Sequence, residues 1–208
     1  MIAALYVDPR GPYAAMPGVI CYTVGREQSE FFRKDDGRSY DGPGPVVAHP
    51  PCGPWGKLRH LSGASEAERT LAPSAVGQVR RWGGVLEHPA GSKLWEALGL
   101  PLPGAEPDRR GGYTIAVSQC EWGHPARKRT WLYLVGVPAS AIEAPPFPGR
   151  APTHWASGSR GKSSRRGAPV PPGIKVCSAQ QRNRTPPLFA EYLVRLAQSA
   201  AQSERKVS

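Results

Sequence analysis

Residues 45–56 read PVVAHPPCGPWG, and this stretch decides the fold. A short apolar run of strand-forming residues ends abruptly in a Pro-Pro-Cys turn, which is typical of a buried parallel strand. Open α/β sheets keep their chemistry at the carboxyl ends of such strands. The turn therefore places the thiol of Cys52 where a functional group is expected. The alternative is a structural cysteine, because a free cysteine is usually only packed.

The same order of strand, polar turn and helix occurs twice. Residues 84–89 read GVLEHP, a second apolar strand that ends in Glu87, a histidine and a proline. Helices are predicted over 74–82, begun by Pro73, and over 94–98. Alternation of strands with helices indicates βαβ units and a parallel sheet.

Two further strands are predicted at residues 113–118 and 130–136, and the linker between them is too short for a crossover helix. They should form an antiparallel hairpin at one edge of the sheet. With a first strand at 5–7 and a second within 18–24, the fold class is α/β, a trimmed Rossmann-like sheet that is mostly parallel with an antiparallel edge hairpin.

Composition and charge divide the chain into three parts. The 24 Pro and 24 Gly among 208 residues predict short elements joined by many turns. The net charge is +11, and between Ala144 and Ala190 there are eight Lys or Arg residues and no Asp or Glu. Such a charge concentration favours contact with a phosphate backbone, the alternative being a solubilising loop. We predict a catalytic core over 1–137, a basic Pro/Gly/Ser-rich insert over 138–184 that becomes ordered on a polyanion, and a C-terminal helix within 185–208 that packs back on the core.

The last helix is predicted from its cap and its apolar face. Thr185 is the expected N-cap, with prolines at the first helical positions. The residues of the predicted apolar face are Leu188, Phe189, Tyr192, Leu193 and Leu196.

Several classes of protein are disfavoured. The four cysteines show no CxxC spacing and the five histidines form no pair at helical spacing, so no metal site is predicted. The first residues are interrupted by charge and proline too soon for a signal peptide, and no apolar run approaches membrane-spanning length. We expect a cytoplasmic protein with reduced thiols.

Three motifs together resemble, in order and spacing, those of the DNA (cytosine-5) methyltransferases, and most of all the short phage-type members. Pro50-Pro51-Cys52 resembles the nucleophile loop and Glu87-His88-Pro89 the Glu-Asn-Val strand end. Residues 123–133, GHPARKRTWLY, resemble the arginine-bearing strand near the flipped base, and the final helix resembles the family's last motif. The resemblance implies a methyltransferase sheet and DNA as the partner.

It also implies roles for individual residues. Cys52 would add to C6 of cytosine and so make C5 nucleophilic. Glu87 would hydrogen-bond N3 and the exocyclic amine, while Arg127 and Arg129 would bind phosphate or the base and help to hold Cys52 as a thiolate. The base would have to be flipped out of the duplex.

The cofactor implied by the resemblance is S-adenosylmethionine. In the family a Phe-x-Gly-x-Gly turn follows the first strand, whereas residues 8–13 read DPRGPY, with one glycine. This is an atypical cofactor motif, and the residues assigned to it are Asp8, Gly11, Tyr13 and Pro50.

The expected function is modification of DNA cytosine at C5, most conservatively methylation from S-adenosylmethionine. One alternative keeps Cys52 and Glu87 without that cofactor, and another is a catalytically silent DNA-binding protein. The residues expected to contact DNA are Lys57, Arg59, Lys128, Arg160, Lys162, Arg165 and Arg166.

Overall fold

Six strands form one sheet in the order β2-β1-β3-β4-β6-β5. The computed structural model describes residues 1–23, 36–56, 59, 63–155 and 172–204. The first four strands are mutually parallel, and β6 runs antiparallel to both β4 and β5. The strands are β1 (Ile2–Leu5), β2 (Val19–Tyr22), β3 (Val46–Ala48), β4 (Gly84–Pro89), β5 (Tyr113–Ser118) and β6 (Arg129–Val135). The predicted Rossmann-like α/β sheet with its edge hairpin is confirmed.

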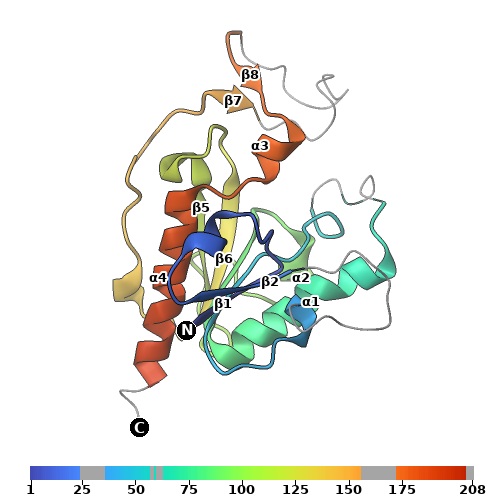
Figure 1. The fold of residues 1–208 in the computed structure, drawn as a ribbon, viewed down its shortest axis with the longest axis vertical. Coiled ribbons are helices and arrows are strands. Elements are labelled where there is room, and N and C mark those ends of the chain that lie inside the picture. Colours follow the sequence, from blue (N-terminus) through green and yellow to red (C-terminus); the bar gives the residue numbers. More distant parts are fainter. Residues whose placement is uncertain (24–35, 57–58, 60–62, 156–171, 205–208) are drawn as a thin grey trace.

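Helices cover both faces of this sheet (Figure 1). The longer helices are α1 (Glu66–Trp82) and α4 (Pro187–Glu204), and α2 (Lys93–Leu98) is short. The 3-10 helices are η1 (Pro12–Ala15), η2 (Gly37–Ser39), η4 (Gln119–Trp122) and η5 (Ala139–Ala141). A separate two-stranded sheet, β7 (His154–Trp155) with β8 (Lys175–Val176), is followed by α3 (Ala179–Asn183).

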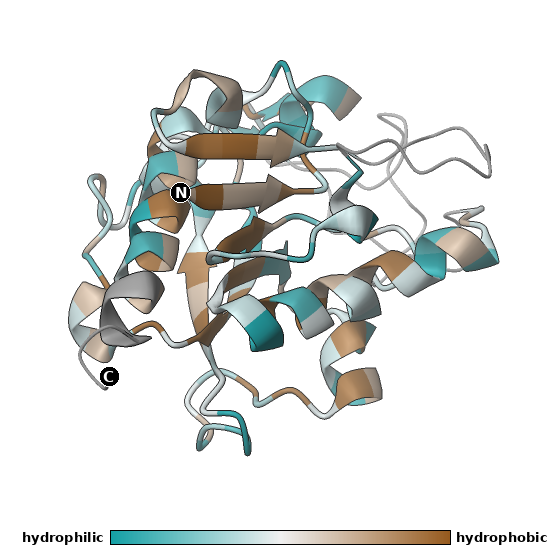
Figure 2. Ribbon diagram, turned by 60° about the horizontal axis from the view of Figure 1, so that its bottom comes forward, coloured by the Kyte–Doolittle hydropathy of each residue, from teal (hydrophilic) through white to brown (hydrophobic). Residues whose placement is uncertain are grey.

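Alternate residues of the central strands feed two apolar cores, one on each face. Val47 packs in the core that includes α4, whereas Val46 and Ala48 pack in the core that includes α1. All three side chains are fully buried, which explains why the sequence of β3 is continuously apolar instead of alternating. The apolar strands and helix faces that meet in these cores appear brown in Figure 2.

The start of α1 differs from the prediction. Ser65 caps the helix by accepting a hydrogen bond from the backbone N–H of Glu68, and Pro73 lies inside it. Proline has no N–H to donate to the carbonyl four residues earlier, but the indole Nε1–H of Trp55 donates to that Arg69 oxygen at 3.2 Å. A side chain from the Cys52 loop thus compensates for the proline.

The predicted apolar face of the last helix is largely confirmed. Phe189, Tyr192, Leu193 and Leu196 are buried against the sheet, but Leu188 is 41% exposed. That part of the prediction is wrong, because Leu188 lies at the border of the apolar face and lines a solvent-open hollow beside the helix. The helix begins at Pro187, and it contacts β1, β3 and β4.

The first strand also begins earlier than predicted. It covers Ile2–Leu5 and ends where Tyr6 adopts a left-handed backbone with φ of 60°. The predicted strand at 5–7 is therefore wrong by about three residues, because a backbone in that region cannot continue a strand. The helix at 94–98 and the other strands are confirmed to within two residues at each end.

Residues 156–171 of the expected basic insert lie outside the described part of the chain. None of the described helices is both long and apolar enough to cross a membrane. Within the same residues, no group of three or more His, Cys, Asp or Glu side chains is placed to hold a metal ion.

Candidate active site

The carboxyl ends of β3 and β4 bring His49 and Glu87 together. The strands are parallel neighbours with Ala48 opposite Leu86. The residues that come next, His49 and Glu87, therefore lie side by side at the carboxyl end of the sheet. His49 Nδ1 lies 3.0 Å from Glu87 Oε2, and both side chains are about 90% buried. In the Nδ1–H tautomer and in the imidazolium form alike, His49 donates to this carboxylate.

Tyr13, in the connection between β1 and β2, contacts this pair. Its hydroxyl lies 2.6 Å from His49 Nε2, and the residue is only 2% exposed. Burial first, and then the charge of Glu87, raises the pKa of Tyr13, so its hydroxyl stays protonated. Tyr13, His49 and Glu87 therefore form one hydrogen-bonded chain across the ends of β1, β3 and β4.

The second oxygen of Glu87 is held by Gln119. The Gln119 amide donates from Nε2 to Glu87 Oε1 and to Thr130 Oγ1, both at 3.0 Å. Gln119 is fully buried at the start of η4, and its backbone N–H donates to the Lys128 carbonyl. The β5–β6 hairpin thus fixes the orientation of the carboxylate.

The electrostatic surroundings keep Glu87 ionised. Burial by itself would raise its pKa, but the charge of Lys128 and the hydrogen bond from His49 outweigh burial and lower the pKa to about 2. Two side chains of the described residues donate to this carboxylate, whereas a carboxylate can accept about four hydrogen bonds. Glu87 therefore has capacity left for a ligand.

Cys52 presents its thiol beside this carboxylate. The residue is solvent-exposed, yet surrounding protein atoms limit hydration of the sulfur, and this desolvation raises the thiol pKa. The charge of Glu87 also raises this pKa, and Lys128 lowers it. In the free protein the thiol is thus not preactivated as a thiolate.

Backbone hydrogen bonds order the loop that carries Cys52. The backbone carbonyl of Cys52 accepts hydrogen bonds from the N–H groups of Trp55 at 3.1 Å and Gly56 at 2.8 Å. The Trp55 carbonyl accepts the N–H of Lys93 at the start of α2. His88 is fully buried beneath the loop; desolvation lowers its pKa to about 4 against the opposing effects of Glu87 and the Pro51 carbonyl. Neither ring nitrogen of this buried, neutral imidazole has a hydrogen-bond partner within the geometric limits among the described residues, so Pro51 acts on it only as a nearby carbonyl dipole.

The basic hairpin contributes a different residue from those expected. Lys128 is the hairpin cation that lowers the pKa of both Cys52 and Glu87. Arg127 and Arg129 are exposed, and their expected roles toward phosphate, base and thiolate stay predictions. Of the residues expected to contact DNA, Arg59 is exposed and Lys128 is half-buried. The others lie outside the described residues: Lys57, Arg160, Lys162, Arg165 and Arg166.

The residues assigned to S-adenosylmethionine do not form a cradle for it. The sheet order reverses between β1 and β3, which is where such folds bind nucleotides. Tyr13 spans this crevice to His49, and Pro50 is buried. Asp8 pairs with Arg10, and a Cβ on Gly11 would meet the Asp8 carbonyl at 2.9 Å. The turn is thus closed on itself, and the residues present do not fit the cofactor.

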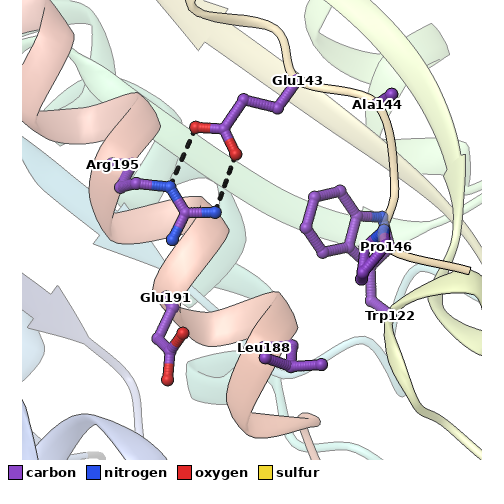
Figure 3. A pocket seen from close by; sticks show the side chains of 7 residues that line it. All are labelled: Trp122, Glu143, Ala144, Pro146, Leu188, Glu191 and Arg195. Carbon is purple, nitrogen blue, oxygen red and sulfur yellow. Dashed lines mark hydrogen bonds and ion pairs between the residues drawn. The ribbon is translucent and has the colours of Figure 1, made fainter.

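A hollow elsewhere on the molecule lies between α4 and residues 143–146 (Figure 3). Its side chains are Trp122, Glu143, Ala144, Pro146, Leu188, Glu191 and Arg195. Arg195 and Glu143 form a two-bond ion pair at 2.8 and 2.9 Å across it. None of the residues of the strand-end network takes part in this hollow.

Sequence reasoning missed four residues of the site: His49, His88, Gln119 and Thr130. The signal for His49 was present, because it directly follows an apolar run in the sequence in the same way as Glu87 does. Gln119 directly follows β5, but its contact with Glu87 depends on how the hairpin folds across β4. In comparisons with family models, curated proteins and solved structures, nothing matches this chain.

Proposed function

We propose that this chain modifies the C5 position of cytosine in DNA through a covalent adduct with Cys52. One observation carries the proposal: an exposed thiol and a buried, ionised carboxylate lie at neighbouring strand ends, close enough for the charge of Glu87 to raise the pKa of the Cys52 thiol. Lys128 from the hairpin acts on both groups. Three stretches far apart in the sequence thus converge on one edge of the sheet.

The chemistry follows from these groups. The Cys52 thiolate forms a bond to C6, and the ring electrons move toward N3, which takes up a proton. The Glu87 carboxylate accepts a hydrogen bond from the exocyclic amine and so fixes the orientation of the base. Carbon C5 then has enamine character and takes a proton from water. Loss of the original C5 hydrogen and of the thiolate restores the base with its C5 hydrogen exchanged.

This exchange requires no cofactor, so it tests the proposal directly. DNA carrying tritium at C5 of cytosine is incubated with the full chain, and tritium release into water is measured. We expect release that Cys52→Ser abolishes and Cys21→Ser leaves unchanged, because Cys21 is a partly buried residue of β2. Equal release by the Cys52→Ser protein would refute the assignment of the nucleophile.

A parallel reaction with methyl-labelled S-adenosylmethionine identifies the electrophile. Label in DNA that disappears in Cys52→Ser would assign methylation, as the sequence resemblance implies. Exchange without label would assign the cofactor-independent reaction, which the closed turn at residues 8–13 favours. DNA binding with neither signal would assign a silent DNA-binding protein. Binding itself should weaken steeply with salt because of the basic stretch between Ala144 and Ala190.

A further inference from the structure

The buried chain Tyr13–His49–Glu87 contains one group that neither the resemblance nor the proposed reaction uses. His49 sits between a neutral phenol and an ionised carboxylate, with contacts of 2.6 and 3.0 Å. Each ring nitrogen of His49 has a partner, which fixes the ring plane and directs Nδ1 at Glu87. The side chain is 11% exposed, so bulk water has little access to it.

The proposed reaction needs a proton that Glu87 cannot supply alone. When the thiolate adds at C6, the electron pair that reaches N3 must be neutralised by a proton. The carboxylate of Glu87 is ionised in the free protein, so it can accept from the exocyclic amine but has no proton to give. A donor must therefore stand behind it.

We propose, resting on the function proposed above, that His49 is a positioning residue that passes a proton through Glu87 to N3 of the pyrimidine. The step begins with imidazolium at His49. Its Nδ1 proton moves to Glu87 Oε2, and the carboxylic acid so formed gives that same proton to N3 as sulfur bonds to C6. Neutral His49 remains, and Tyr13 donates to its Nε2. Elimination of the thiolate reverses each transfer, so protons and electrons balance.

The titratable groups that face His49 or its two partners come from five parts of the fold: Tyr13 from η1, Cys21 from β2, Glu87 and His88 from β4, Cys52 from the loop after β3, and Lys128 from the hairpin.

His49→Asn is the matched variant, because its side-chain amide can still donate to Glu87 from nearly the place of Nδ1 but carries no transferable proton. We expect its tritium release to fall about 100-fold or more, the usual range for loss of an acid-base group, with DNA affinity unchanged. The pH profile is the decisive readout. Wild-type release should pass through a maximum, since it needs a thiolate and an imidazolium together, whereas release by His49→Asn should only rise with pH.

Tyr13→Phe provides a second variant that retains the buried ring. It should keep the maximum but lower the rate less than His49→Asn does, because only the orientation of His49 is lost. Release by His49→Asn within about threefold of wild type, with the maximum retained, would overturn the proton-transfer role while leaving Cys52 as the nucleophile. Absence of release from the wild-type protein would instead overturn the proposed function, and this inference with it.

Discussion

The pKa is lowered for two carboxylates of this molecule, the buried Glu87 and the half-buried Asp108, but they differ in how many hydrogen bonds they accept. Asp108 accepts from the Tyr133 hydroxyl, from Arg80 and from two backbone N–H groups, so about all of its acceptor positions are filled. Glu87 accepts from His49 and Gln119 alone among the described residues. Both pKa values fall to about 2 although burial opposes this. The same ionised state therefore serves a closed structural cluster in one place and an unfinished binding edge in the other.

The partners differ in kind as well as number. Arg80 carries a permanent charge and lies over the Tyr133 ring at 5.7 Å, which ties α1 to β6. His49 lies within hydrogen-bond distance of Glu87 through Nδ1, and the neighbouring Cys52 thiol is reactive when ionised. A fixed cation stabilises a fold, whereas a titratable donor beside a nucleophile suits chemistry.

The largest expected effect is on activity, which should depend on Glu87 and not on Asp108. Glu87→Gln should reduce tritium release from cytosine C5 by about 100-fold or more, because the amide cannot relay a proton and repels the exocyclic amine. Asp108→Asn should leave release within about twofold of wild type, since it lies outside the strand-end site. Comparable losses in both variants would abolish the distinction drawn between them.

The dependence of stability on acidic pH should reveal the contribution of ionised Glu87. For both groups the folded pKa lies below the unfolded value, so their stabilisation is present above about pH 4 and is lost as pH falls toward 2. Between these limits wild type should lose on the order of 3 kcal/mol more unfolding free energy than Glu87→Gln does. Chemical denaturation at a series of pH values measures this; parallel curves for the two proteins would contradict it.

At neutral pH the half-buried Asp108 cluster should stabilise the fold more than an exposed ion pair does. Asp108→Ala should lower the unfolding free energy by roughly 2 kcal/mol, because Arg80, Tyr133 and two backbone N–H groups lose their acceptor at a partly buried site. Urea unfolding provides the measurement, with Asp41→Ala as the control. Asp41 pairs with Arg81, which lies on the same helix as Arg80, but the side chains of Asp41 and Arg81 are both more than 60% exposed. An equal loss from both variants would mean that burial does not decide the contribution.

The smallest effect is expected at the hollow in Figure 3. Glu143 and Arg195 are joined by two hydrogen bonds, but about half of each side chain is exposed. Water and salt screen such a pair, so Glu143→Gln should change the unfolding free energy by less than about 1 kcal/mol. A larger change in the same urea experiment would show that good geometry alone makes a carboxylate cluster structural.

The sequence determined the sheet because apolar runs and turns are local signals. The continuous apolar stretch at 46–48, the paired strand ends at Cys52 and Glu87 and the short link between β5 and β6 each depend on neighbouring residues alone. Those features predicted the parallel core, the edge hairpin and the two candidate groups. The start of α1 was missed because Pro73 looks like a helix start unless a distant Trp55 is known to occupy the Arg69 carbonyl.

Tertiary structure decided what surrounds the two groups. The contact of His49 with Tyr13 spans 36 residues, and that of Gln119 with Glu87 spans 32, so no local pattern could indicate them. No local pattern indicates the effect of the Lys128 charge on Cys52 and Glu87, or the closed turn before Tyr13, either. Hydrogen bonds and charges act through space, and a chain specifies them only after its strands have been placed in order. The sequence indicated the thiol and the carboxylate, and the fold placed His49 between that carboxylate and Tyr13 and assembled the rest of the site.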